Sequence, residues 1–229
     1  MGSFVFDVDG QRFAEDMGGD SYELPGYFGP QRWSYYRLNS HGHNVPLFGN
    51  ESQVPAPANV TAFSSAPAVK QGVLVDGWGV VDLSRGYAGA TQVKRGFVSL
   101  NASSALLVVD EWEGVETNVS VQLHTRAAAA LNGATAALSL GGAAALLAVL
   151  PAATRCGALG AWEAVELAPL LPSPPYDTAA GFRRLQALAP SGVPCTRVAV
   201  ALGDPALVRA LLVGVKLAPL DAWPSEGPL

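Results

Sequence analysis

The stretch "AAAALNGATAALSLGGAAALLAVL", residues 127–150, decides the fold class, because its length and apolar character also suit a membrane helix. It lies in a run of 28 positions without a charged residue. Two turn dipeptides, Asn132-Gly133 and Gly141-Gly142, divide it into segments of strand length. Its many alanines also contribute little to membrane insertion. We therefore predict strands at residues 135–140 and 143–150, and no membrane insertion.

Alternation of apolar and polar residues continues on both sides of this stretch, with turn residues about every ten positions. The further predicted strands are residues 73–75, 79–83, 93–100, 105–110 and 119–124. Residues 183–188 fit either a strand or a helical turn, and Asp204-Pro205 starts either a short helix or an edge strand. Residues 170–181 are predicted to form a Pro-rich loop. The pattern predicts an all-β antiparallel β-sandwich that forms one domain over residues 1–229.

Composition narrows the class of protein. The chain has 229 residues, of which 49% are apolar, and this is enough for a sizeable core. Only 14% are charged and the net charge is −5, so the protein lacks the basic surface that nucleic-acid binding requires. Cys156 and Cys195 form either one disulfide or two buried thiols.

The first residues read as a strand, an Asp9-Gly10 turn and a second strand, without a secretory signal. We interpret this opening as a domain shortened at its N-terminus. Acceptor patterns for N-glycosylation occur at Asn50, Asn59, Asn101 and Asn118. They are either coincidental or indicate a secreted or cell-envelope protein.

Polar and aromatic residues gather in "RWSYYRLNSHGHNV", residues 32–45, which contains two of the three histidines. Asp16 and Asp20 flank a Gly-Gly turn nearby, and a carboxylate beside the imidazole of His43 is the beginning of a metal site. Two ligands do not hold a metal, so the alternative is that Asp16 caps a turn and bonds to His43 without one. His124 lies on the less apolar face of its strand, where we expect ordinary hydrogen bonds to neighbours.

The segment "GSFVFDVDGQRFAEDMGGDSYELPGYF", followed by "RWSYYRLNSHGHN", resembles the opening of the β-sandwich domain of the heparinase II/III-like polysaccharide lyases. Later segments, "VVDLSRGYAGATQVKRGFVSL", "ALLVVDEWEG" and "VQLHTRAAAALNG", resemble later strands of the same domain. The resemblance covers most of the chain. It implies a C-terminal sandwich domain that lines the substrate cleft.

The resemblance also implies roles for individual residues. Asp16 and His43 correspond to ligands of a structural zinc. The face that meets the sugar chain carries the implied substrate-binding residues Arg32, Trp33, Arg37 and His41 and the implied catalytic residues Tyr35 and Tyr36. An aromatic ring can lie against a sugar, and a guanidinium can bind a uronate carboxylate through two hydrogen bonds.

The implied reaction is β-elimination in an acidic, uronate-containing polysaccharide by a carbon–oxygen lyase. The family's helical toroid and a His-x-His pair, which supply a catalytic tyrosine and a further zinc ligand, are not among these 229 residues. We therefore expect the chain alone to be inactive and to bind zinc weakly or not at all. The alternative function is a non-catalytic carbohydrate-binding or structural module.

Overall fold

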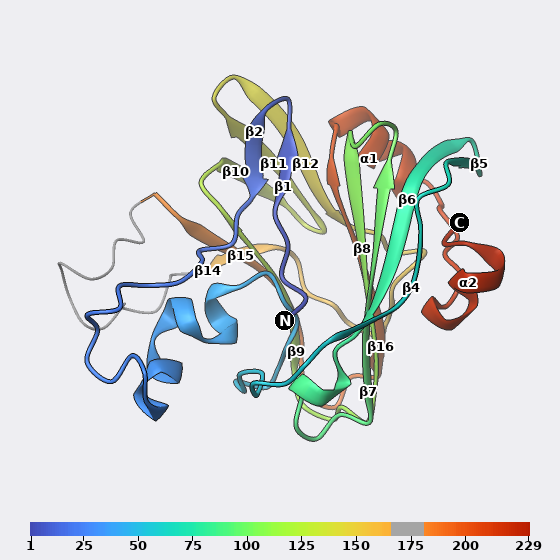
Figure 1. Ribbon diagram of the computed structural model, residues 1–229. Helices are drawn as coiled ribbons and strands as arrows, with labels where there is room; N and C mark the ends of the chain where they lie inside the picture. Colours follow the sequence, from blue (N-terminus) through green and yellow to red (C-terminus); the bar gives the residue numbers. More distant parts are fainter. Residues whose placement is uncertain (166–180) are drawn as a thin grey trace.

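The structure is a computed structural model that describes residues 1–165 and 181–229. It contains three antiparallel sheets, of ten, four and two strands (Figure 1). The two larger sheets pack face to face, as the strand pattern predicted. The expected all-β antiparallel sandwich is confirmed.

The ten-stranded sheet is the largest of the three. Its strands lie in the order β10 (Ala128–Asn132), β11 (Thr135–Leu140), β12 (Ala143–Val149), β16 (Cys195–Gly203), β8 (Ala105–Glu113), β7 (Gln92–Leu100), β6 (Val73–Asp82) and β4 (Asn59–Ser64), with β13 (Arg155–Cys156) beside β16 and β5 (Ala68–Lys70) beside β6. Most neighbours in this order are consecutive in the sequence, because two-residue turns and short loops join them.

The stretch that decides the fold forms β10, β11 and β12 in two tight hairpins. Asn132 pairs with Thr135 and Leu140 with Ala143, so each turn has two residues. Gly133, Gly141 and Gly142 all have positive φ values, which glycine adopts without steric cost. No helix in the described part of the chain is long and apolar enough to cross a membrane.

The structure also settles the secondary structure of several other predicted segments. The strands predicted at residues 73–75 and 79–83 form a single strand, β6, with a shift in register between Val75 and Gly77. Residues 183–188 are part of strand β15 (Arg183–Ala189). Asp204 caps helix α1 (Pro205–Leu212) by accepting a hydrogen bond from the backbone N–H of Leu207 at 2.8 Å. Residues 170–180 of the predicted Pro-rich loop lie outside the described residues.

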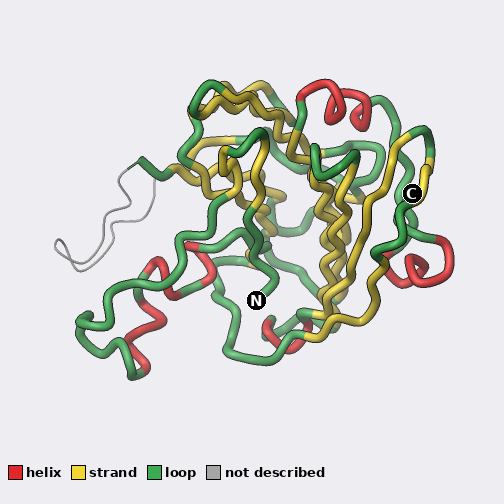
Figure 2. The backbone as a smooth tube through the Cα atoms, turned by 45° about the horizontal axis from the view of Figure 1, so that its top comes forward, coloured by secondary structure: helices red, strands yellow, loops and turns green. Residues whose placement is uncertain are grey.

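Each face of the ten-stranded sheet is covered. On one face, α1 and α2 (Trp223–Glu226) bury apolar side chains that include Val208 and Trp223 (Figure 2). The ring of Trp223 lies so close to Gly96 of β7 that a side chain at that position would collide with it. The opposite face packs against the four-stranded sheet, whose order is β14 (Glu163–Val165), β15, β9 (Val119–Thr125) and β3 (Leu47–Phe48).

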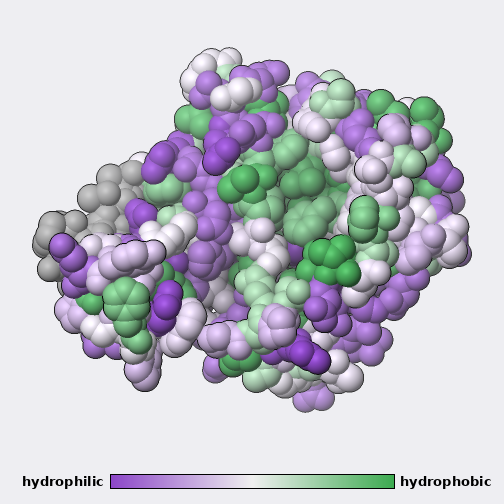
Figure 3. All heavy atoms as spheres, viewed as in Figure 1, coloured by the Kyte–Doolittle hydropathy of each residue, from purple (hydrophilic) through white to green (hydrophobic). Residues whose placement is uncertain are grey.

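The third sheet is the hairpin of β1 (Phe6–Val8) and β2 (Gln11–Ala14). Its turn has φ values of 50° at Asp9 and 71° at Gly10, the left-handed conformation that such hairpins require. On the face seen in Figure 1, apolar residues gather in a hollow beside this hairpin (Figure 3). A small cavity of about 20 Å³ between the two larger sheets is also lined mainly by apolar side chains. Neither region offers many groups to a polar ligand.

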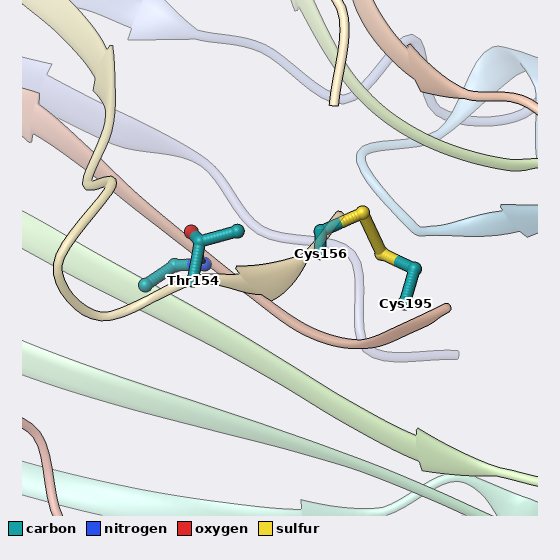
Figure 4. The surroundings of a disulfide bond; sticks show 4 residues. Thr154, Cys156 and Cys195 are labelled. Atoms are coloured by element: carbon teal, nitrogen blue, oxygen red, sulfur yellow. Dashed lines mark hydrogen bonds between the residues drawn. A yellow bond between two sulfur atoms is a disulfide. The ribbon is translucent and has the colours of Figure 1, made fainter. Parts of the chain in front are cut away.

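The two cysteines form a disulfide. Cys156 of β13 bonds to Cys195 of β16 across 39 positions (Figure 4). Thr154 lies nearby and its hydroxyl accepts a hydrogen bond from the backbone N–H of Ala199 at 3.1 Å. The disulfide therefore fastens a two-residue edge strand to the large sheet.

Candidate functional site

The candidate site lies on the polar face of the four-stranded sheet. Strand β9 alternates, so that Val121 and Leu123 enter the core while Gln122 and His124 lie on the opposite face. In the adjacent strand β15, Arg184 pairs with His124 and Gln186 with Gln122. This face is covered by short 3-10 helices, η1 (Pro30–Ser34), η2 (Tyr36–Leu38) and η3 (Ser40–Gly42), drawn in blue in Figure 1.

A chain of hydrogen bonds fixes the protonation of His124, which is fully buried. The amide nitrogen of Asn44 donates to the carbonyls of Phe4 (2.9 Å) and Glu15 (2.8 Å), so its oxygen is the acceptor. That oxygen accepts from the backbone N–H of His124 at 2.7 Å and lies 3.2 Å from Nδ1. Nδ1 therefore carries the proton. Nε2 is left to accept the hydroxyl hydrogen of Tyr36 at 2.8 Å.

The surroundings keep this pair neutral. Burial, with the positive charge of Arg184 as a further cause, lowers the pKa of His124 to about 3. Burial also raises the pKa of Tyr36 to about 12, although a hydrogen bond from Arg184 opposes the change. At neutral pH, Tyr36 is thus a protonated phenol whose hydrogen points at a neutral imidazole. His124 lies on the less apolar face of its strand and bonds to neighbours, as expected, but the covering segment buries it completely.

Asp16 and His43 meet as the sequence predicted. Oδ2 of Asp16 lies 2.8 Å from Nδ1 of His43 and also accepts from the hydroxyl of Ser3, while Oδ1 accepts from the backbone N–H of Gly18 at 2.8 Å. Burial alone would raise the pKa of Asp16, but the hydrogen bonds from His43 and Ser3 outweigh it and lower the pKa to about 2.

A carboxylate and an imidazole this close were expected to come from neighbouring strands, and this expectation was wrong, because neither residue lies in a strand. Asp16 follows β2, and His43 ends η3. The turn at η3 is held by Gln122, whose side-chain amide donates to the carbonyls of Ser40 (2.7 Å) and His43 (2.6 Å). These side-chain hydrogen bonds from β9, rather than backbone pairing between strands, hold the segment that carries His43.

Zinc does not fit the residues present. Among residues 1–165 and 181–229, no group of three or more His, Cys, Asp or Glu side chains could hold a metal ion. Asp20, a candidate third ligand, accepts from the backbone N–H of Ser21 instead. Asp16 and His43 therefore supply two ligands where a structural zinc takes four. Their role as zinc ligands stays a prediction.

Three of the predicted sugar-contacting residues, Arg32, Trp33 and Arg37, lie in a lobe formed by residues 22–38 over the sheet. The guanidinium of Arg32 lies 4.8 Å from the ring centroids of both Tyr27 and Trp33, and 45% of Trp33 is exposed. Arg37 donates to the carbonyl of Met17 at 3.1 Å. This arrangement presents an aromatic surface with a cation held against it.

Tyr35 does not share that exposed surface. It is buried in a small cluster with Leu24, Tyr27 and Leu38. Its hydroxyl donates to the carbonyl of Pro25 at 2.6 Å. The side chain thus holds the lobe together, and its predicted catalytic role finds no support in this geometry.

His41 is separate from the lobe and lines a pocket of about 280 Å³ with residues of the four-stranded sheet, among them Arg184 and Glu163. Burial lowers the pKa of His41. Sequence reasoning missed Asn44, Gln122 and Arg184 as parts of the site. The alternation of polar and apolar residues in "VSVQLHT" and "RRLQALA" could have indicated Gln122 and Arg184, because it places both side chains on the polar face of the sheet.

A buried ion pair ties the site to the large sheet. Arg95 and Asp110 lie opposite each other on β7 and β8, and their side chains form two hydrogen bonds of 2.7 and 2.9 Å. The remaining guanidinium nitrogen of Arg95 donates to the carbonyls of Gly2 and Asn44. Asn44 is therefore hydrogen-bonded both to Arg95 of the ten-stranded sheet and to His124 of the four-stranded sheet.

Comparison with solved structures identifies the architecture. A heparinase III gene product matches with a TM-score of 0.63 over 88% of this chain at 12% identity, and the heparan sulfate lyase HepC from Pedobacter heparinus matches with a TM-score of 0.58 over 88% at 13% identity. A further heparinase III structure matches with a TM-score of 0.57 over 85% at 14% identity. The fold is similar to part of a heparinase.

The similarity covers only 30% of the length of the heparinase III gene product and of HepC. No protein-family model matches the sequence. No curated protein matches it either. The resemblance stated from the motifs is thus confirmed for the fold, by structures whose sequences differ greatly from this one.

Proposed function

We propose that this chain forms the sandwich face of the substrate cleft in a polysaccharide lyase that cleaves uronate-containing chains by β-elimination. The fold shared with heparinase III and heparan sulfate lyase structures carries the proposal. The chain spans less than a third of their length, so its expected contribution is substrate binding rather than the whole reaction.

The lobe of residues 22–38 supplies the chemistry that such a face needs. Exposed Trp33 can lie against the apolar face of a sugar ring, and the guanidinium of Arg32 beside it can pair with a carboxylate. Arg37 lies behind this surface and fastens it to Met17. An acidic polysaccharide is therefore the expected ligand.

Of the two tyrosines, Tyr36 fits an acid role better than a base role. Removal of the C5 proton requires a phenolate, whereas a phenol with a pKa of about 12 stays protonated at neutral pH. A protonated phenol can give its hydrogen to the leaving 4-oxygen once it turns from His124. Asp16 and His43 stiffen the same face through their own hydrogen bond.

The disulfide supports a secreted or cell-envelope location. Such bonds persist in oxidising compartments and are rare in the cytosol. Glycosylation at the acceptor patterns would be consistent with the same location.

The alternative function is a carbohydrate-binding module without chemistry. One observation favours it: the hydroxyls of Tyr35 and Tyr36 are both engaged with partners inside the protein, Pro25 and His124. A module of this kind needs only the exposed lobe.

Two measurements test the proposal. First, calorimetric titration with a uronate oligosaccharide should detect binding that weakens as salt is added, because the contacts are partly ionic. Replacing Trp33 with Ala should weaken it about fivefold, since an aromatic contact of this kind contributes about 1 kcal/mol. Phe63→Ala is the matched control, because 74% of Phe63 is exposed on a distant edge strand. Equal affinity for a neutral glucan would contradict the proposed ligand.

Second, the ultraviolet absorbance of the unsaturated product reports lyase activity. We expect none from this chain alone, since loss of an acid–base group typically removes a factor of about 10² to 10⁴. Binding without turnover also fits the alternative module. Turnover by this chain would show that its own residues suffice and exclude that alternative.

A further inference from the structure

The pocket lined by His41 and Arg184 lies on the same face of the four-stranded sheet as His124, and the function proposed above does not use it. The pocket of about 280 Å³ lies between the segment around residues 41–50 and the four-stranded sheet. Its lining consists of His41, Leu47, Gly49, Asn50, Asn118, Ser120, Glu163, Arg184, Gln186 and Leu188. The lining combines amide, carboxylate and guanidinium groups with two leucines, a composition suited to a polar ligand of limited size.

Two buried arginines of the large sheet have carboxylate partners, whereas Arg184 has none among the described residues. Arg95 pairs with Asp110 and Arg197 with Glu111. Within the part of the chain that the structure describes, no carboxylate forms an ion pair with Arg184, and its Nε is buried without a hydrogen-bond partner. Arg184 is partly buried, so part of its guanidinium has lost contact with water without gaining an anion, and an anion that binds there would supply the missing partner.

The guanidinium of Arg184 is also held in place. The hydroxyl hydrogen of Tyr36 points at His124, so the phenol oxygen is free to accept a hydrogen bond from Arg184. His124 is in turn fixed by Asn44. Tyr36 thus contacts the guanidinium of Arg184 from the side of the buried residues, and Arg184 also lines the pocket.

We propose that this pocket binds one anionic group of an oligosaccharide, a uronate carboxylate or a sulfate ester, with Arg184 as its principal ligand. The inference rests on the proposed function, because that function supplies the saccharide. Glu163 weakens the attraction for an anion at the pocket, while Gln186 and Asn118 are placed to bind neighbouring hydroxyls. Arg184 and Glu163 together suit a sugar with a single anionic group better than a densely sulfated one.

The test compares two adjacent arginines. Arg184→Gln should reduce affinity for an acidic tetrasaccharide at least tenfold, because the variant loses the charge-assisted hydrogen bonds between the guanidinium and the anion. Arg183→Gln removes the same charge from an exposed position one residue earlier and should change affinity less than twofold. Titrations with an unsulfated uronate tetrasaccharide and with a sulfated neutral one distinguish the two anions. The protein is made without glycans, because Asn50 and Asn118 line the pocket.

Two further variants cover the case in which Arg184→Gln fails to fold. Arg184→Lys keeps the charge but not the fork of donors, and should lose several-fold in affinity. Glu163→Gln removes the opposing carboxylate and should raise affinity. If wild type and all these variants bind with the same affinity, the pocket is not the anion-binding site, and the proposed function is unaffected. If wild type binds neither acidic tetrasaccharide, both fail.

Discussion

The hydroxyl of Tyr36 lies 2.8 Å from Nε2 of His124, although 88 positions of sequence separate them. Replacing Tyr36 with Phe leaves that buried nitrogen without a donor and releases Arg184. We expect the free energy of unfolding to fall by about 1 to 3 kcal/mol in urea titrations. Tyr22→Phe is the control, since 72% of Tyr22 is exposed, and it should change stability by less than about 0.5 kcal/mol. Equal effects of the two changes would mean that the bond contributes nothing.

His124 should make stability depend on pH. Its pKa is about 3 when folded and 6.5 in the reference state, so the unfolded chain binds more protons between these values. The contribution of His124 to the free energy of unfolding should therefore be complete above pH 6.5. It should decline as the pH falls toward 3, by at most about 1.4 kcal/mol per pH unit.

The measurement is the urea midpoint at several pH values, for wild type and for His124→Gln. The variant should show a flatter slope in this range. Asp16 acts in a lower range, because its pKa falls from 3.8 to about 2 on folding, and its contribution is lost as the pH drops through about 2. An unchanged slope in His124→Gln would assign the pH dependence to other groups.

Zinc should bind this chain weakly. Two protein ligands leave the coordination shell incomplete, so elemental analysis after dialysis should find far less than one zinc per chain. Any residual affinity in a chelator competition should disappear in His43→Ala and Asp16→Asn. It should persist in Asp9→Asn, which alters a carboxylate at the exposed hairpin turn. Stoichiometric zinc in the wild type would show that a further ligand reaches the pair.

Reduction of the disulfide should destabilise the protein. Cys156 and Cys195 close a loop across 39 positions, for which the loss of unfolded-state entropy predicts a contribution of about 2 to 4 kcal/mol. Urea titrations with and without a reductant measure the difference. The double substitution of both cysteines with Ser should match the reduced protein and be insensitive to reductant.

The sheets could be predicted from the sequence because their signals are local. Gly133 and the Gly141-Gly142 pair each lie in a two-residue hairpin turn, and the first of these turns, Gly133-Ala134, begins one residue later than the predicted Asn132-Gly133 dipeptide. The covering segment could not be predicted in the same way. Residues 30–42 form three short 3-10 helices, and η3 is held by Gln122, which lies about eighty positions away.

Alternation along β9 likewise placed His124 on the polar face but could not show that Tyr36 covers it. The residues themselves suggested that Asp16 and His43 lie close together, and the family resemblance implied the same pair. Arg184 gave no signal by itself, because an arginine on a strand is ordinarily a solvated side chain.

The hydrogen-bond chain from Asn44 through His124 and Tyr36 to Arg184 also bears on the order of folding. Hairpins such as β10 to β12 need only neighbouring residues and can form quickly, whereas contacts between distant segments require the closure of long loops. Strand β15 is synthesised after β9 and after the segment that covers both strands, so the face is incomplete until β15 pairs with β9. The binding face is therefore expected to be among the last parts to assemble. Until then, its polar side chains stay hydrated and the nascent protein cannot hold a sugar.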